Sequence, residues 1–228
     1  MPTPDLAAVE LQIVQQTNAF RREHKLGELK PNAVLRAAAE GFARYLAKTN
    51  TFSHTADGRQ PAERAKTAGY SYCLVAENLA LNMDSRGFSS VQLATDAVEG
   101  WKKSPGHREN LLRGPLTEIG VAIAKAPGEE KYLSVQLFGR PSSLQYQFKI
   151  TNRSDASVTY KLDGAGQSIQ PREIVTHTEC NASKLSFESA SRGLFSSKQP
   201  IGGRFEPKAG ASYVIEASGT NIVVGEPK

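Results

Sequence analysis

Residues Glu118–Phe138, EIGVAIAKAPGEEKYLSVQLF, give the clearest structural signal in the first part of the chain. Apolar residues occupy alternate positions on both sides of a Pro-Gly pair: Ile119, Val121 and Ile123, then Leu133, Val135 and Leu137. A period of two predicts strands, and Pro127-Gly128 between them predicts a hairpin turn. Each strand of this hairpin has an apolar face that another layer must cover.

Upstream of the hairpin the apolar residues follow a helical period. Residues 6–24 predict a helix with Asp5 as its N-cap, and further helices are expected after Pro31-Asn32, from Pro61 to Gly69 and from about Ser90 to Lys103. The segment between the last two is expected to be a loop. Helices that cover a sheet form a layered domain, so we expect an α/β domain over residues 1–140.

Downstream of the hairpin the helical period disappears. Alternating apolar residues recur between turn residues, at Tyr146/Phe148/Ile150, Val158/Tyr160/Leu162, Leu185/Phe187 and Tyr213/Ile215. This spacing predicts a β-sandwich or a small barrel over residues 141–228, after a junction near Arg140-Pro141. The expected fold class of the whole chain is therefore α+β.

The composition of the 228 residues argues against a nucleic-acid-binding surface and against a membrane span. The net charge is +5, but residues 1–140 hold 18 basic and 15 acidic side chains and residues 141–228 hold 10 and 8. This small, even excess is not the concentrated basic stripe of a nucleic-acid-binding surface. No apolar run is long enough for a membrane span, so we expect a protein that is not transmembrane.

The two cysteines, Cys73 and Cys180, lie in different halves of the chain. Either they form a single bridge between the halves, or they are two unpaired thiols that act as small apolar side chains. The pattern favours the unpaired thiols, and it offers neither a disulfide framework nor a thiolate metal site.

Two of the four histidines lie in segments that favour a functional site. His54 follows a helix and precedes the turn Asp57-Gly58, while His107 is expected in the first turn of a helix that begins at Ser104-Pro105. The helix dipole there disfavours the imidazolium form, and a neutral imidazole is the form that binds metals.

Between these histidines, Glu77 is closely flanked by apolar residues, so its carboxylate must be paired, protonated or a ligand. Together His54, Glu77 and His107 would form a three-ligand metal site with an open position. The long spacing equally fits structural histidines held by hydrogen bonds, and Ser104 fits a helix cap better than a nucleophile.

Several segments resemble the CAP superfamily of cysteine-rich secretory, antigen-5-like and pathogenesis-related proteins. The match rests on four motifs, followed by Ile119-Gly120-Val121-Ala122, over about residues 6–140. The motifs are Asn18–His24, Phe52-Ser53-His54, Ala76-Glu77-Asn78-Leu79-Ala80 and Ser104–Leu112 with its Ser-Pro-Gly-His form, which is typical of the bacterial branch. The module after residue 141 lies outside the resemblance.

The resemblance implies an α-β-α sandwich, secretion or a place in the cell envelope, and a cleft that some members use to bind zinc. The absence of a signal peptide at Met1–Asp5 would then indicate a mature chain. By position, His54, His107 and Glu77 correspond to three members of the family's His/Glu tetrad. Lys103-Ser104-Pro105 stands where the second glutamate is expected, and Glu99 is only a weak substitute.

These observations favour a cleft that binds zinc, another divalent cation or a small ligand, including the lipids that some family members bind. Its metal ligands are expected to be His54, Glu77 and His107, with Ser104, Asn78 and Asp57 lining the cleft. Two alternatives remain. One is a metal-dependent extracellular hydrolase of peptide or ester bonds, for which catalytic residues are unknown. The other is adhesion of residues 141–228 to an envelope polysaccharide or protein.

Overall fold

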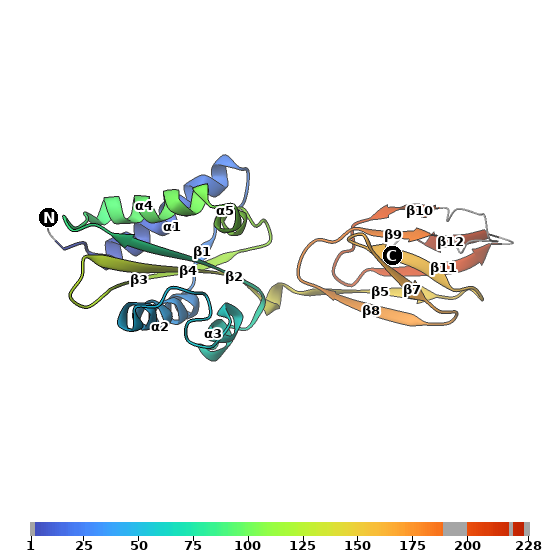
Figure 1. The fold of residues 1–228 in the computed structure, drawn as a ribbon. Coiled ribbons are helices and arrows are strands. Elements are labelled where there is room, and N and C mark those ends of the chain that lie inside the picture. Colours follow the sequence, from blue (N-terminus) through green and yellow to red (C-terminus); the bar gives the residue numbers. More distant parts are fainter. Residues whose placement is uncertain (1–2, 189–199, 219–220, 226–228) are drawn as a thin grey trace. The chain divides into compact units, whose positions relative to one another are not determined.

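The computed structural model describes residues 3–188, 200–218 and 221–225. The chain divides into two compact units, Met1–Leu144 and Gln145–Lys228, so the boundary lies slightly beyond the junction expected near residue 140. The first unit contains helices and a sheet, and the second contains strands (Figure 1). The α+β class is confirmed.

Over its described residues 3–144, the first unit contains five α-helices and four strands, followed by a short 3-10 helix at Ser142–Leu144. The helices are α1 (Leu6–Glu23), α2 (Ala33–Thr49), α3 (Pro61–Thr67), α4 (Ser90–Lys103) and α5 (Pro105–Leu111). The strands are β1 (Lys30–Pro31), β2 (Tyr72–Met83), β3 (Glu118–Lys125) and β4 (Lys131–Pro141). They form one sheet in the order β1-β3-β4-β2, in which only the short β1–β3 pair is parallel.

The helices cover both faces of this sheet (Figure 1). Helices α1, α4 and α5 enclose one core with Ile13, Val98 and Trp101, while α2 and α3 enclose the other with Phe42 and Ala65. The α-β-α sandwich is therefore confirmed. The predicted helices and the hairpin lie where expected, and Asp5 caps α1 by accepting hydrogen bonds from the first turn.

Strand β2 is the element that the sequence pattern did not reveal, since residues between α3 and α4 were expected to form a loop. Residues Ala76–Leu79 in its middle are buried in succession, so no polar/apolar alternation marks this part of the strand. Pairing with β4 places Glu77 opposite Leu137 and Asn78 opposite Gln136. Residues Ala76–Ala80 therefore lie on a strand whose backbone is paired with β4.

The second unit consists of strands in two four-stranded sheets, within the described residues. The strands are β5 (Tyr146–Asn152), β6 (Val158–Leu162), β7 (Ala165–Ile169), β8 (Ile174–Glu179), β9 (Leu185–Glu188), β10 (Pro200–Phe205), β11 (Ser212–Ser218) and β12 (Asn221–Gly225). The sheet orders are β10-β9-β6-β7 and β12-β11-β5-β8. Both sheets contribute side chains to one core, which contains Phe148, Tyr160, Phe187 and Tyr213. The predicted sandwich is therefore confirmed.

Neither cysteine is a free thiol. Cys73 and Cys180 are both disulfide-bonded, so the expectation of two unpaired thiols is wrong. Sequence separation carries no information about distance in the fold, and this is why the pattern could not decide the question. No helix in the described part of the chain is long and apolar enough to cross a bilayer.

Candidate functional site

Three elements of the first unit bring His54, Glu77 and His107 together. His54 lies in the loop between α2 and α3, Glu77 on β2, and His107 in the first turn of α5. The Nδ1 atom of His54 is 2.8 Å from Oε1 of Glu77, and the ring centroids of His54 and His107 are 6.4 Å apart. Residues from three separate stretches of the chain therefore share one polar cluster.

The Glu77 carboxylate is completely engaged. Its side chain is only 1% exposed, and while Oε1 is bonded to His54, Oε2 accepts a hydrogen bond of 2.7 Å from Nη2 of Arg64. A buried carboxylate is tolerated when charge and hydrogen bonds compensate it. Of the three states expected for Glu77, the structure shows the paired one.

Arg64, on α3, is the residue of this cluster that no sequence pattern indicated. Its Nη1 atom donates to Oδ1 of Asp57 (2.9 Å) and to the carbonyl of Arg59 (2.7 Å), and its Nη2 atom also donates to the carbonyl of His54 (3.0 Å). The guanidinium carbon lies 3.5 Å from the centroid of the Phe42 ring. A helical arginine gives no sequence signal for burial, because most arginines on helices are solvated.

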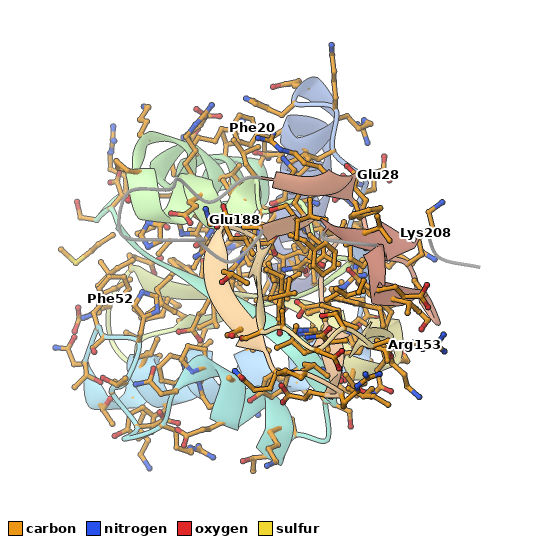
Figure 2. All side chains as sticks on the ribbon, turned by 90° about the vertical axis from the view of Figure 1, so that its right-hand side faces the viewer. Phe20, Glu28, Phe52, Arg153, Glu188 and Lys208 are labelled. Carbon is orange, nitrogen blue, oxygen red and sulfur yellow. The ribbon has the colours of Figure 1, made fainter. Side chains whose placement is uncertain are left out.

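Asp57 lies at the start of the turn that follows His54. Burial opposes the charged form of its carboxylate, but hydrogen bonds from the backbone and side chain of Arg59 and the positive charge of Arg64 nevertheless lower its pKa. The ionised Asp57 therefore holds the loop through two arginines rather than projecting as a free ligand. Phe52, just before His54, is 49% exposed on the surface of the unit (Figure 2).

His107 is partly buried, and burial lowers the pKa of its imidazole, with a further decrease from the neighbouring charge of His54. The neutral form is thus favoured, as expected, and burial is the largest cause. Ser104 and Pro105 occupy the N-cap and the first helical position of α5, as predicted. The Ser104 side chain, however, makes no capping hydrogen bond.

Asn78 lies beneath the cluster and is fully buried. Its Nδ2 atom donates to the carbonyl of His107 (3.2 Å) and to Oε1 of Gln136 (3.1 Å), and its Oδ1 atom accepts from Nδ2 of Asn110 (3.0 Å). Asn110 also donates to the backbone carbonyl of Glu77 (3.1 Å). These bonds fix α5, and with it His107, against β2.

The other end of α5 is held by a second buried arginine, Arg21 on α1. Its Nη1 atom donates to the carbonyls of Leu111 (2.8 Å) and Arg113 (3.1 Å). Carbonyls at a helix C-terminus have no partner within the helix, so these bonds satisfy groups that would otherwise be buried and unpaired. The position of His107 thus depends on bonds at both ends of a short helix.

No residue in the described part of the chain completes the cluster as a second glutamate. Glu99 on α4 is bonded to Lys102 at 2.8 Å, and this hydrogen bond, together with charges of Lys102 and Lys103, lowers the pKa of its carboxyl. Within residues 3–188, 200–218 and 221–225, no three His, Cys, Asp or Glu side chains are arranged to hold a metal ion. A cation bound at this cluster would depend mainly on the imidazoles of His54 and His107.

Comparisons with known proteins agree with this architecture. Residues 14–138 match the model of the cysteine-rich secretory protein family, CAP. The uncharacterized protein YkwD of Bacillus subtilis is 28% identical over 122 residues, which are 53% of this chain and 44% of YkwD. The chain spans less than half the length of the curated relatives that it matches.

Among solved structures, an outer surface protein from Borrelia burgdorferi is similar with 25% identity and a TM-score of 0.50, over 57% of this chain and 90% of that protein. An extracellular protein with an SCP domain from Bacillus anthracis is similar with 26% identity and a TM-score of 0.48, over 59% and 41% of the two chains. The family match covers more than half of the chain and the whole His54 cluster. The chain therefore belongs to the cysteine-rich secretory protein (CAP) family.

Proposed function

We propose that this CAP protein binds a divalent cation such as Zn²⁺ through the imidazoles of His54 and His107, and that it acts outside the cytoplasm. The observation that carries the proposal is the pair of imidazoles, 6.4 Å apart, one of which is held by a buried carboxylate. A cation bridging them would link the loop after α2 to α5.

The donor set of the cleft fits such a cation. Because Glu77 accepts a hydrogen bond from Nδ1 of His54, the neutral ring carries its proton there and leaves the lone pair of Nε2 available. A carboxylate bonded to the second nitrogen of a ligating histidine is a common arrangement at metal sites, where it orients the ring and raises its basicity. The lowered pKa of His107 favours the neutral ring that a cation needs.

The same contacts define the part that Glu77 plays. To bind the cation directly, its carboxylate would have to release either His54 or Arg64, and both bonds are short. We therefore assign Glu77 to orienting His54 instead of direct coordination. With two protein ligands, water or a small ligand would have to complete the coordination, so we expect binding to be weaker and more exchangeable than at a three-histidine site.

The test is a calorimetric titration of metal-stripped full-length protein with Zn²⁺, beside the variant His54→Ala/His107→Ala. The control is His177→Ala, which removes a histidine from the second unit, where it contacts Tyr160. Binding of one Zn²⁺ per chain that only the first variant abolishes supports the proposal. Loss in both variants, or no binding by the intact protein, contradicts it.

Two observations support an extracytoplasmic location. Both cysteines are disulfide-bonded, and disulfides persist mainly in oxidising compartments. The similar protein from Borrelia burgdorferi is an outer surface protein. Protein isolated from its native cells without reductant should resist thiol alkylation at Cys73 and Cys180 and fractionate outside the cytoplasm. Reduced cysteines in a cytoplasmic fraction would refute this location.

A further inference from the structure

We propose that Arg64 is the positioning residue of the cleft, which fixes the ring of His54 through Glu77 and holds the Glu77 carboxylate away from a bound cation. The inference deepens the proposed function and rests on it for the effect on cation binding. The effect on the His54 ring is independent of any cation.

A single nitrogen of Arg64 holds His54 from two sides. Nη2 donates to the backbone carbonyl of His54 (3.0 Å) and also to Oε2 of Glu77 (2.7 Å), whose Oε1 is bonded to the His54 ring (2.8 Å). The backbone and the side chain of His54 are therefore both tied to one guanidinium. Replacing Arg64 would therefore loosen both the backbone of His54 and the hydrogen bond that orients its ring.

The guanidinium is itself held on its other edge and on one face. Nη1 donates to Oδ1 of Asp57 and to the carbonyl of Arg59, and the plane lies against Phe42 at 3.5 Å from the ring centroid. This use of both terminal nitrogens and of the planar face requires a guanidinium, which the single ammonium of a lysine does not reproduce.

The charge balance explains why Glu77 stays with Arg64. The side chains of Arg64 and Glu77 are 3% and 1% exposed, and Asp57 is shared between Arg64 and the half-exposed Arg59. If Glu77 turned to a cation, Arg64 would lose a buried counter-charge while a second positive charge arrived nearby. A buried charge without its partner is strongly unfavourable. Arg64 consequently makes Glu77 an orienting group.

The alternative is that Arg64 only braces the loop from His54 to Arg59. The matched control is Arg59→Met, because Arg59 braces the same loop through Asp57 and does not touch Glu77. A bracing role predicts similar effects of Arg64→Met and Arg59→Met. A positioning role through Glu77 predicts that only Arg64→Met changes the state of the His54 ring.

The experiment combines proton NMR of the His54 Nδ1–H, in the absence of metal, with Zn²⁺ titration of the full chain. In Arg64→Met we expect the hydrogen-bonded Nδ1–H signal to be lost to solvent exchange and the affinity for Zn²⁺ to fall about 10–100-fold. In Arg59→Met we expect the signal to persist and the affinity to stay within about 3-fold, because Glu77 keeps both of its partners. Arg64→Lys should show faster exchange of Nδ1–H than the unmodified protein.

The two proposals fail in different ways. Absence of Zn²⁺ binding by the unmodified protein contradicts the proposed function, while the NMR signal still tests Arg64. An unchanged Nδ1–H signal in folded Arg64→Met overturns the positioning role. If Arg64→Met does not fold, Arg64→Lys decides, and unchanged exchange in that variant likewise overturns the proposal.

Discussion

His54 in the first unit and His177 in the second are both bonded histidines, but their surroundings differ in kind. The side chain of His54 is 48% exposed, contacts a buried carboxylate and lies near another imidazole. The ring of His177 stacks on Phe148 with centroids 5.0 Å apart and contacts Tyr160 edge-on at 5.5 Å. Nε2 of His177 is 2.9 Å from the Tyr160 hydroxyl.

The difference shows what makes a histidine available for chemistry. At His54 a carboxylate engages Nδ1 and the side chain stays about half exposed, whereas at His177 the Tyr160 hydroxyl engages Nε2 and the Phe148 ring stacks on one face. Burial alone lowers the pKa of His177. A histidine packed against aromatic rings thus contributes to stability, whereas the half-exposed, carboxylate-bonded His54 is the histidine on which the proposed cation site rests.

The largest effect is expected from His177→Ala. Removing a ring that packs on Phe148 and Tyr160 should destabilise the second unit by about 2–3 kcal/mol, somewhat less than the loss of a fully buried aromatic ring. Hydrogen exchange followed by mass spectrometry on the full chain reports each unit separately, so protection should fall in β5, β6 and β8. Protection in β2 and β4, and Zn²⁺ affinity, should not change. A loss of Zn²⁺ binding in this variant would mean that His177, too, contributes to cation binding.

Next in size is the effect of Glu77→Gln on the cleft. An amide has one oxygen in place of two, so it cannot accept a hydrogen bond from His54 on one oxygen and from Arg64 on the other. We therefore expect the Zn²⁺ affinity to fall about 10–100-fold. The matched variant Tyr160→Phe removes the partner of the other histidine and should leave the affinity unchanged. Calorimetric titration measures both. Equal affinities for Glu77→Gln and the unmodified protein would mean that the carboxylate does not orient His54.

A smaller effect is expected from acidification of the second unit. Burial lowers the pKa of His177 below its ordinary value of 6.5, so the folded unit binds fewer protons than the unfolded one. Stability is therefore fully present above pH 6.5 and decreases as the pH falls from there toward the lowered folded-state pKa. Exchange protection of β5 and β8 should decline over this range, and less so in His177→Gln. An identical decline in both proteins would assign the pH dependence to other groups.

The smallest effect is expected at Ser104, because its side chain makes no capping hydrogen bond although it precedes α5. Ser104→Ala should change the stability of the first unit by less than about 0.5 kcal/mol, as for a surface substitution. Ser89, which caps α4 through the backbone N–H of Gln92 at 3.1 Å, provides the contrast, with a loss of about 1 kcal/mol in Ser89→Ala. Thermal unfolding of the two variants compares them, and an equal loss would indicate that Ser104 does cap α5 in solution.

Local signals explain which elements were predicted correctly. Helix α4 begins and ends where its apolar period placed it, and the β3–β4 hairpin follows the alternation around Pro127-Gly128. Strands β5, β6, β9 and β11 coincide with the alternating stretches of the second unit. Each of these features depends on neighbours within a few positions, so it can be read without knowing the fold.

The site was predictable in part for the same reason. His54, Glu77 and His107 stand out through their motifs, and the structure brings them together. The strand that carries Glu77 was not recognised, because burial in its middle removes the alternation that marks a strand. Arg64 gave no signal, since its burial depends on Asp57, Glu77 and Phe42, which reach it from three other segments.

Local sequence patterns predicted the family, the two-part organisation, the polarity pattern of the helices and strands, and the two histidines that the structure brings close together. The folded structure was needed to show that Glu77 is shared between His54 and Arg64, that Asn78 is buried, and that Cys73 and Cys180 are not free thiols. The physical reason is the distance along the chain between the residues that interact. Periodicity, caps and turns arise from interactions along the chain, whereas the state of a buried polar group depends on partners that the fold brings from distant positions.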